Sequence, residues 1–373
     1  MELLKVFQQI EDPRIERKKL YSLESVLGIA LCAMLSGATD FEEMEAFGLS
    51  KLDLMSQLFD LPNGIPSHDT FNRVFKLVKP EAVSKVLTDH THSIIRELND
   101  KQICIDGKCL RGTNDSGNSG KKGNRCQNIV SAWISTHRLV IGQQQVASKS
   151  NEITAIPELL EQINLQGTIV TIDAIACQTE IVAQIADSGG TYVLPVKDNQ
   201  PTLRMELEKH FEQEIATSDT DETLTIDHGR IEMRSCRVSN DLRNIHVKER
   251  WQGLNTIIEI KRQTTFKKTG QKRKEQTQYY IANASMTAKQ ANQFVRNHWG
   301  IENELHWQLD VTFKEDQNMT TDKNAVQNLN TLRKLTLQII ENNNNSKKSK
   351  KVRIKSIGWD DKQLLNLFRN TNF

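Results

Sequence analysis

The chain lacks any apolar run long enough to cross a membrane, and it lacks an excess of charge of one sign. Its longest apolar run, residues 26–38, is too short to span a bilayer and contains glycine and serine. The first residues, MELLKVFQQIEDPR, do not show a signal peptide's order of charge, apolar run and cleavage site. Basic residues number 49 and acidic residues 47, so the net charge of +2 does not by itself indicate a nucleic-acid or membrane partner. We therefore exclude transmembrane, secreted and fibrous classes and expect a cytoplasmic protein.

Paired metal-binding cysteines are also missing. The six cysteines include no CxxC pair and no Cys/His spacing of the zinc type. Several lie in apolar stretches such as ALCAML and QICID, so we expect reduced, buried thiols without a chemical role.

The length of 373 residues predicts two to three domains, and the apolar patterning changes near residue 100. Apolar residues recur at three- and four-residue steps over 23–35, which predicts an amphipathic helix. Further helices are predicted over 41–47, 51–58 and 71–77. We expect an N-terminal all-helical domain over residues 1–98.

From residue 101 onward, short apolar strands alternate with helices. Strands are predicted over 102–106, 168–173 and 191–196, together with a hairpin over 128–146. This alternation predicts an α/β fold with a mixed sheet, in the order expected of an RNase H-like core. Helical patterning resumes near residues 287 and 325, and we expect this second domain to span 101–340.

Residues 200–285 break the alternation. Strand-like stretches over 222–226, 231–238 and 257–262 predict a β-rich insertion, and the basic residues between 261 and 274 predict a cationic loop. Residues 341–373 contain an asparagine run at 342–345, followed by a stretch rich in lysine and arginine. We expect a flexible basic linker there, followed by a short final helix.

Two carboxylates, Asp106 and Asp173, follow separate apolar strands. Neighbouring strand ends in an α/β sheet bring such side chains together, and a hard divalent cation such as Mg²⁺ would offset their repulsion. The alternative is that each aspartate only caps the turn after its strand, as Asp-Gly at 106–107 commonly does.

A third group of polar residues lies in the segment VRNHWGIENELHWQLDVTFKED at 295–316. If this segment is helical, His298, Glu302, His306 and Asp310 share one stripe because they are four residues apart. Flanking aromatic and apolar residues favour a functional face. A transition-metal site of His-x₃-Glu-x₃-His spacing and a solvated helix face are the alternatives.

The sequence resembles the DDE transposases of bacterial insertion sequences, in the ISAs-type branch that includes the H-repeat-associated proteins. The resemblance covers residues 10–340. The motifs that carry it are DPR at 12–14, GIPSHDTFNRV at 64–74, IDGKCLRG at 105–112, SNEITAIPELL at 150–160, TIDAIACQ at 171–178, VKDNQ at 196–200, HGRIEMR at 228–234 and HWGIENELHWQLDVTFKED at 298–316.

The resemblance implies an RNase H-like core whose three acids hold two Mg²⁺ or Mn²⁺ ions. Carried over by motif, these acids are Asp106, Asp173 and Glu302, with Glu304 as the alternative third acid. The wider family often has Tyr and Arg near the glutamate. Here the Tyr position holds Val295 and the Arg position holds His298, while Arg296 lies on a different helical face.

A DNA enzyme gives the basic residues an obvious partner, although surface charge is the alternative. The candidates for DNA contacts are Lys108, Arg111, Lys197, Arg230, Lys267, Lys268, Lys272, Arg273, Lys274, Arg296 and His298.

The expected function is metal-dependent DNA strand cleavage and strand transfer through an Asp/Asp/Glu triad. The expected partner is double-stranded DNA, both terminal repeats and target, bound by at least a dimer in a synaptic complex at the nucleoid. The N-terminal helices are expected to recognise the terminal repeats. The alternatives are a catalytically inactive, element-derived DNA-binding protein and an RNase H-like nuclease without strand transfer.

Overall fold

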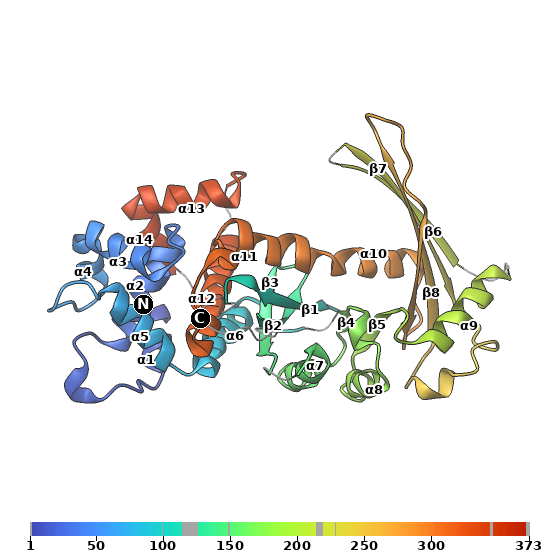
Figure 1. Ribbon diagram of the computed structural model, residues 1–373, viewed down its shortest axis with the longest axis horizontal. Coiled ribbons are helices and arrows are strands. Elements are labelled where there is room, and N and C mark those ends of the chain that lie inside the picture. Colours follow the sequence, from blue (N-terminus) through green and yellow to red (C-terminus); the bar gives the residue numbers. More distant parts are fainter. Residues whose placement is uncertain are drawn as a thin grey trace, which may run out of the picture.

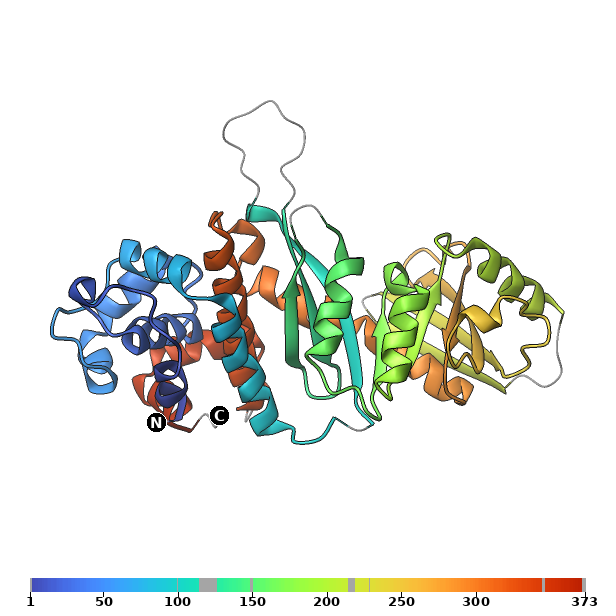
Figure 2. The same ribbon diagram turned by 90° about the horizontal axis from the view of Figure 1, so that it is seen from below.

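The computed structural model describes residues 2–98, 100–113, 126–147, 150–213, 219–227, 229–343 and 346–370. A helical region, a central α/β region and a β-rich region lie in a row along the long axis of the molecule (Figure 1, Figure 2). No helix within these ranges is long and apolar enough to cross a membrane.

The predicted N-terminal helical region is confirmed. Side chains cap its helices, since Ser22 accepts a hydrogen bond from the Ser25 amide and Asp40 accepts one from the Glu43 amide. Its elements are α1 (Glu2–Gln8), η1 (Glu16–Lys18), α2 (Leu23–Leu35), α3 (Phe41–Ser50), α4 (Leu52–Leu58), α5 (His68–Leu77) and α6 (Pro80–Ile94).

Helix α2 differs from the amphipathic helix that its periodicity predicts. Every residue of α2 except Glu24 is buried, because neighbouring helices enclose it on all sides. A helix that is apolar all round forms the centre of a bundle.

The central region has the predicted α/β architecture with a large mixed sheet. Helices α7 and α8 cover one face of the sheet (Figure 1). Its elements are β1 (Gln102–Leu110), η2 (Arg111–Thr113), β2 (Gln127–Ile134), β3 (Leu139–Gln145), α7 (Glu152–Glu161), β4 (Ile169–Ile172), η3 (Ala174–Ala176), α8 (Thr179–Asp187) and β5 (Thr191–Val196).

The insertion extends this sheet instead of forming a separate one. The strand order is β3-β2-β1-β4-β5-β9-β8-β7-β6, in which β1, β4 and β5 are parallel and β9 joins β5 in antiparallel fashion. The pattern indicated three of the inserted strands and missed β9. The inserted elements are α9 (Pro201–Glu212), β6 (Asp219–Asp227), β7 (Arg230–Ser239), η4 (Lys248–Arg250), β8 (Thr256–Phe266) and β9 (Gln276–Ala282).

The last part of the chain crosses the other face of the sheet and returns to the N-terminal helices. Helix α10 contacts strands of both the core and the insertion, and α12 packs on α2, α5 and α6 (Figure 1). The elements are α10 (Ala288–His298), η5 (Ile301–His306), α11 (Trp307–Val311), η6 (Glu315–Gln317), α12 (Lys323–Asn342), α13 (Lys350–Trp359) and α14 (Asp361–Asn370).

The flexible linker expected after residue 341 is wrong for residues 350–359, which form α13, whereas the short final helix expected after it is present as α14. Four apolar residues of these two helices are buried in the same core as the N-terminal helices: Ile354, Ile357, Leu364 and Phe368. The prediction failed because these apolar residues are widely spaced within a lysine-rich stretch, whose composition is typical of a linker. Residues 344 and 345 of the asparagine run lie outside the described ranges.

We predict that Phe368→Ala lowers the free energy of unfolding by about 3–5 kcal/mol, because it empties a buried site against the ring of Phe59, whose centroid is 5.8 Å away. Urea unfolding followed by circular dichroism measures the change. The control, Trp359→Ala, alters a side chain that is 75% exposed and should change stability by no more than about 0.5 kcal/mol. Equal effects of the two substitutions would show that the C-terminal helices do not support the core.

Candidate active site

The pairing of β1 with β4 places two aspartates side by side. These strands are parallel, and their last paired residues are Ile105 and Ile172, so the next residues are Asp106 and Asp173. Asp106 does not end its strand as predicted, because β1 continues to Leu110 in its pairing with β2. Asp173 follows β4 and caps η3 by accepting a hydrogen bond from the Ile175 amide at 3.1 Å. The turn-capping alternative is therefore true of Asp173 as well.

The helical layer on the other face of the sheet brings in the third acid. Glu302 lies in η5, a π-helical segment that continues from α10. Asp106, Asp173 and Glu302 line one cavity of about 140 Å³ together with Lys197 and His298. π-Helical turns are rare and are often found at functional sites.

The negative charges of the three acids are unfavourable, because the carboxylates are partly buried and lie close to one another. Burial raises the pKa of Asp106 to about 7, and Glu302 and Asp173 contribute to the rise. Burial also raises the pKa of Asp173 and Glu302, which Lys197 partly offsets in both. A cation between them would relieve this repulsion.

The donor set suits a hard divalent cation, since carboxylate oxygens are the ligands that Mg²⁺ prefers. Among the described residues, no three His, Cys, Asp or Glu side chains are arranged so that they could hold a metal ion by themselves. Mg²⁺ commonly uses one or two carboxylates and takes its remaining ligands from water and substrate phosphates. The acids therefore fit a site that a phosphate substrate completes.

A fourth acid, Glu152 at the start of α7, was missed by the sequence interpretation. A Cβ on Gly107 would lie 2.3 Å from the Glu152 carboxyl group, so glycine at this position permits the approach. Burial raises the pKa of Glu152, with a further contribution from Asp173. Glu152 is the third residue of the SNEITAIPELL motif, which begins four residues after the predicted hairpin, and this position was the available signal.

The stripe predicted for the segment 295–316 faces the sheet. His298 Nδ1 lies 3.1 Å from the hydroxyl of Thr171, and His306 Nδ1 lies 3.5 Å from the Asp106 carboxylate. Burial lowers the pKa of His298 to about 4 and that of His306 to about 3. Both imidazoles are therefore neutral near pH 7, and the stripe is only partly solvated, because Glu302 is exposed whereas His306 is buried. His298 lines the acidic cavity as a neutral group.

Lys108 is not available to DNA in this structure. The side chain is buried, and its ammonium donates to Asp310 at 2.6 Å, Glu315 at 3.1 Å and Asp316 at 3.3 Å. Burial alone would lower the pKa of Lys108, but these carboxylates outweigh it and raise the pKa. The alternation of side chains along β1 turns Lys108 to the same face as Asp106, toward the helical layer.

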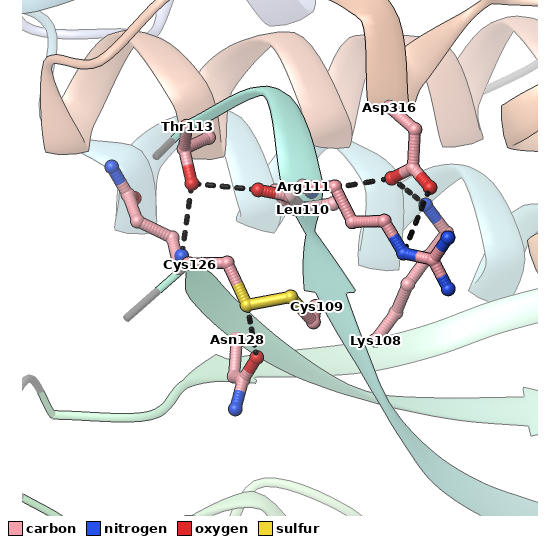
Figure 3. The surroundings of a disulfide bond; sticks show 9 residues. Lys108, Cys109, Leu110, Arg111, Thr113, Cys126, Asn128 and Asp316 are labelled. Atoms are coloured by element: carbon pink, nitrogen blue, oxygen red, sulfur yellow. Dashed lines mark hydrogen bonds and ion pairs between the residues drawn. A yellow bond between two sulfur atoms is a disulfide. The ribbon is translucent and has the colours of Figure 1, made fainter. Parts of the chain in front are cut away.

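A disulfide joins the end of β1 to the residue before β2, so the expectation of six reduced thiols is wrong for Cys109 and Cys126. Their Cα atoms are 5.7 Å apart (Figure 3). Sequence spacing could not reveal the pair, because only the β1–β2 register brings the two residues together. The other four cysteines are buried and free, as expected.

The remaining candidates for DNA contacts lie in different places. Arg111 is exposed beside Asp316 (Figure 3). Lys197 lines the acidic cavity, and Arg296 lines a second cavity next to the inserted strands. The other candidates lie where β7 begins and β8 ends, and there Arg230 and Arg273 lie over the Phe266 ring. His228 of the HGRIEMR motif lies outside the described residues. The side chains at the tips are exposed: Arg230, Lys267, Lys268, Lys272, Arg273 and Lys274.

Glu304, the alternative third acid, is turned away from Asp106 and Asp173. Its carboxylate pairs with Arg138 at 2.5 Å, and it is not among the residues that line the acidic cavity.

Comparison with known proteins identifies the class. Residues 98–339 match the family described as "Transposase DDE domain", and residues 4–91 match the family described as "DDE_Tnp_1-associated". The chain therefore belongs to the DDE transposase-domain family, and the resemblance drawn from its motifs is confirmed.

Two relatives illustrate the match. The chain is 35% identical over 352 residues to the "H repeat-associated putative transposase YhhI" of Escherichia coli (strain K12), with 92% of each chain covered. It is 34% identical over 342 residues to the "Putative transposase YncI" of Escherichia coli O157:H7, with 91% of this chain and 87% of that protein covered. A solved structure of the piggyBac transposase synaptic complex with hairpin DNA covers 99% of this chain and 79% of its own, at a TM-score of 0.45 and 11% identity, which is too low to support an argument.

The ion pairs of Lys108 and Arg111 provide a test of the buried network. Lys108→Met removes the cation that Asp310 contacts at 2.6 Å and one of the two cations that pair with buried Glu315, so we predict a loss of about 3–5 kcal/mol in the free energy of unfolding. The matched control is Arg111→Met, which removes an exposed cation 3.6 Å from the same Asp316 and should cost about 0–1 kcal/mol. Urea unfolding at constant pH measures both. Similar small losses would show that Lys108 does not hold β1 to the helical layer.

Proposed function

We propose that the chain is an insertion-sequence transposase that cleaves DNA strands and transfers them with Asp106, Asp173 and Glu302. The observation that carries this proposal is the single cavity that the three acids line. Strands β1–β5 with their helices would form its RNase H-like core, and the inserted strands would extend the core on one side.

The acids would hold two divalent ions, Mg²⁺ or Mn²⁺, beside a DNA phosphate. When bound, such ions would activate an attacking oxygen and stabilise a leaving oxygen of a phosphodiester. Asp106, Asp173 and Glu302 reach the cavity from three separate elements and would be the residues that hold the ions.

Neighbouring side chains orient the acids. The neutral imidazole of His306 lies beside Asp106, and the amide of Ile175 donates to Asp173. Lys197, which is exposed and lines the same cavity, can contact a phosphate oxygen at the rim. Lys108 acts indirectly by holding β1 against the helical layer.

DNA would extend from this cavity over the basic tips of β7 and β8, with the N-terminal helices recognising the terminal repeats. The resemblance to DDE transposases implies a synaptic complex that holds two DNA ends, so we propose at least a dimer on DNA. The domain limits that we propose are 1–98 for end recognition and 101–340 for catalysis, joined through the core that α12 shares with the N-terminal helices.

The triad is tested with Asp106→Asn, Asp173→Asn and Glu302→Gln. Each substitution should abolish cleavage and joining of a labelled duplex that ends in the inverted repeats flanking the gene, while DNA binding in EDTA persists, because each keeps side-chain size and removes one charge. A variant that combines two of these substitutions should lose little more cleavage activity than either single variant, since the acids act at one site.

The matched control is Asp198→Asn. This acid follows β5, whose neighbour is β4, but its side chain is 92% exposed and it does not line the cavity. It should keep wild-type activity. Cleavage that survives the triad substitutions, or that continues in excess EDTA, would contradict the proposal, whereas cleavage without joining would favour the nuclease.

The basic loop is tested through salt dependence. Neutralising Lys267, Lys268, Lys272, Arg273 and Lys274 should lower the slope of log affinity against log salt by about 0.9 for each DNA phosphate that the loop no longer neutralises. The control is Arg204→Gln, because Asp198 and Glu208 already offset that exposed guanidinium. An unchanged slope after neutralisation would show that the loop is only a solvated surface.

A further inference from the structure

A second cavity lies beside the acidic one and has the opposite character. It measures about 420 Å³ and lies between the inserted strands and the carboxyl end of α10. Trp299 lines both cavities. Arg234 of β7, Arg262 of β8 and Arg296 of α10 all contribute to its walls.

Arg234 is the unusual member of this group. Only 6% of the residue is exposed, yet its Nε has no hydrogen-bond partner among the described residues. Buried guanidinium groups are normally paired, because an unpaired buried charge is costly. Burial lowers the pKa of Arg234, Glu232 offsets this in part, and the nearby Arg296 and Arg262 lower it further.

The other two guanidinium groups are held mainly by neutral oxygens. Arg296 donates to the Thr225 hydroxyl at 2.8 Å. Arg262 donates to the amide oxygen of Gln276 at 2.5 Å and forms a long ion pair with Glu232 at 3.9 Å. Among the described residues, Glu232 is therefore the carboxylate that partly offsets the charge of this group.

Carboxylates do not balance the group. Two acids, Glu232 and Glu304, are among the residues that line the cavity. Glu304 already pairs with Arg138, which is not among the lining residues. Three guanidinium groups are therefore left with Glu232 as their nearest carboxylate within the described lining.

We propose that this cavity, defined by Arg234, Arg262 and Arg296, binds a phosphodiester of the DNA strand whose neighbouring phosphate enters the acidic cavity. The inference rests on the proposed function and adds a binding site to it. A phosphate is an anion of suitable size with several acceptor oxygens, and guanidinium groups donate to such oxygens in pairs. The indole of Trp299, 38% exposed, offers a flat surface to the sugar or base between the two phosphates.

The test measures binding of a random-sequence DNA duplex in EDTA, so that no chemistry takes place. Arg234→Gln and, separately, Arg262→Gln should each weaken binding and lower the slope of log affinity against log salt by about 0.9, the value for one neutralised phosphate. The thermal midpoint of Arg234→Gln should not fall, because the substitution removes an unpaired buried charge. A purely structural arginine would instead lower the midpoint and leave the slope unchanged.

The matched control is Arg243→Gln, in the same insertion. Its side chain is 86% exposed and pairs with Asp241, away from the cavity, so its slope should equal that of the wild type. Arg262 is half-buried, so its variant gives a reading even if Arg234→Gln folds poorly. Wild-type slopes for both cavity variants would overturn the inference and leave the proposed function standing. A wild-type protein that binds no DNA would instead contradict the proposed function itself.

Discussion

Repulsion among carboxylates is the interaction on which the rest of the structure depends. The parallel register of β1 and β4 puts Asp106 beside Asp173, and η5 adds Glu302 from the opposite layer. Because burial raises the pKa of Asp106 to about 7, this carboxyl group is only partly ionised at neutral pH. Such a cluster keeps its charge only where a rigid scaffold prevents the acids from separating and a cation offsets them.

Buried ion pairs provide that rigidity. Lys108, two residues after Asp106, is bound to Glu315, which in turn accepts from Asn330 and pairs with Arg333 of α12. Helix α12 packs on α2, α5 and α6, so the strand that carries Asp106 is joined to the N-terminal helices by charge as well as by apolar contact. End recognition and catalysis would therefore share one packed core, and a DNA end held by the helices would have a fixed position relative to the acids.

The sequence predicted what depends on local pattern and on motif. The strands before Asp106 and Asp173, the helical stripe with Glu302 and the mixed α/β architecture all follow from periodicity within single elements. It could not predict contacts that arise only when distant elements pack. The burial of Lys108 by acids about two hundred positions later, the approach of Glu152 to Gly107 and the burial of Phe368 in the N-terminal core are of this kind. The sequence wrongly indicated solvent exposure for Lys108 and for the C-terminal helices, because lysines and lysine-rich segments usually lie on the protein surface.

Two cavities of opposite charge, both lined by Trp299, suit a polyanion whose charges recur along a strand. A phosphate enters the acidic cavity favourably only with cations bound there, so the acids alone contribute nothing to holding DNA. Binding energy must then come from phosphates that do not react, and interactions remote from the reacting centre can fix its geometry. Arginines on the sheet strands and on α10 suit the binding of such phosphates better than the exposed lysines at the strand tips do. Their side chains are already held by protein contacts, so they lose less conformational freedom when a phosphate binds. The helical run from α10 through η5 carries Arg296, Trp299 and Glu302 in sequence, so it would couple the position of a phosphate bound by Arg296 to that of Glu302, the proposed catalytic acid.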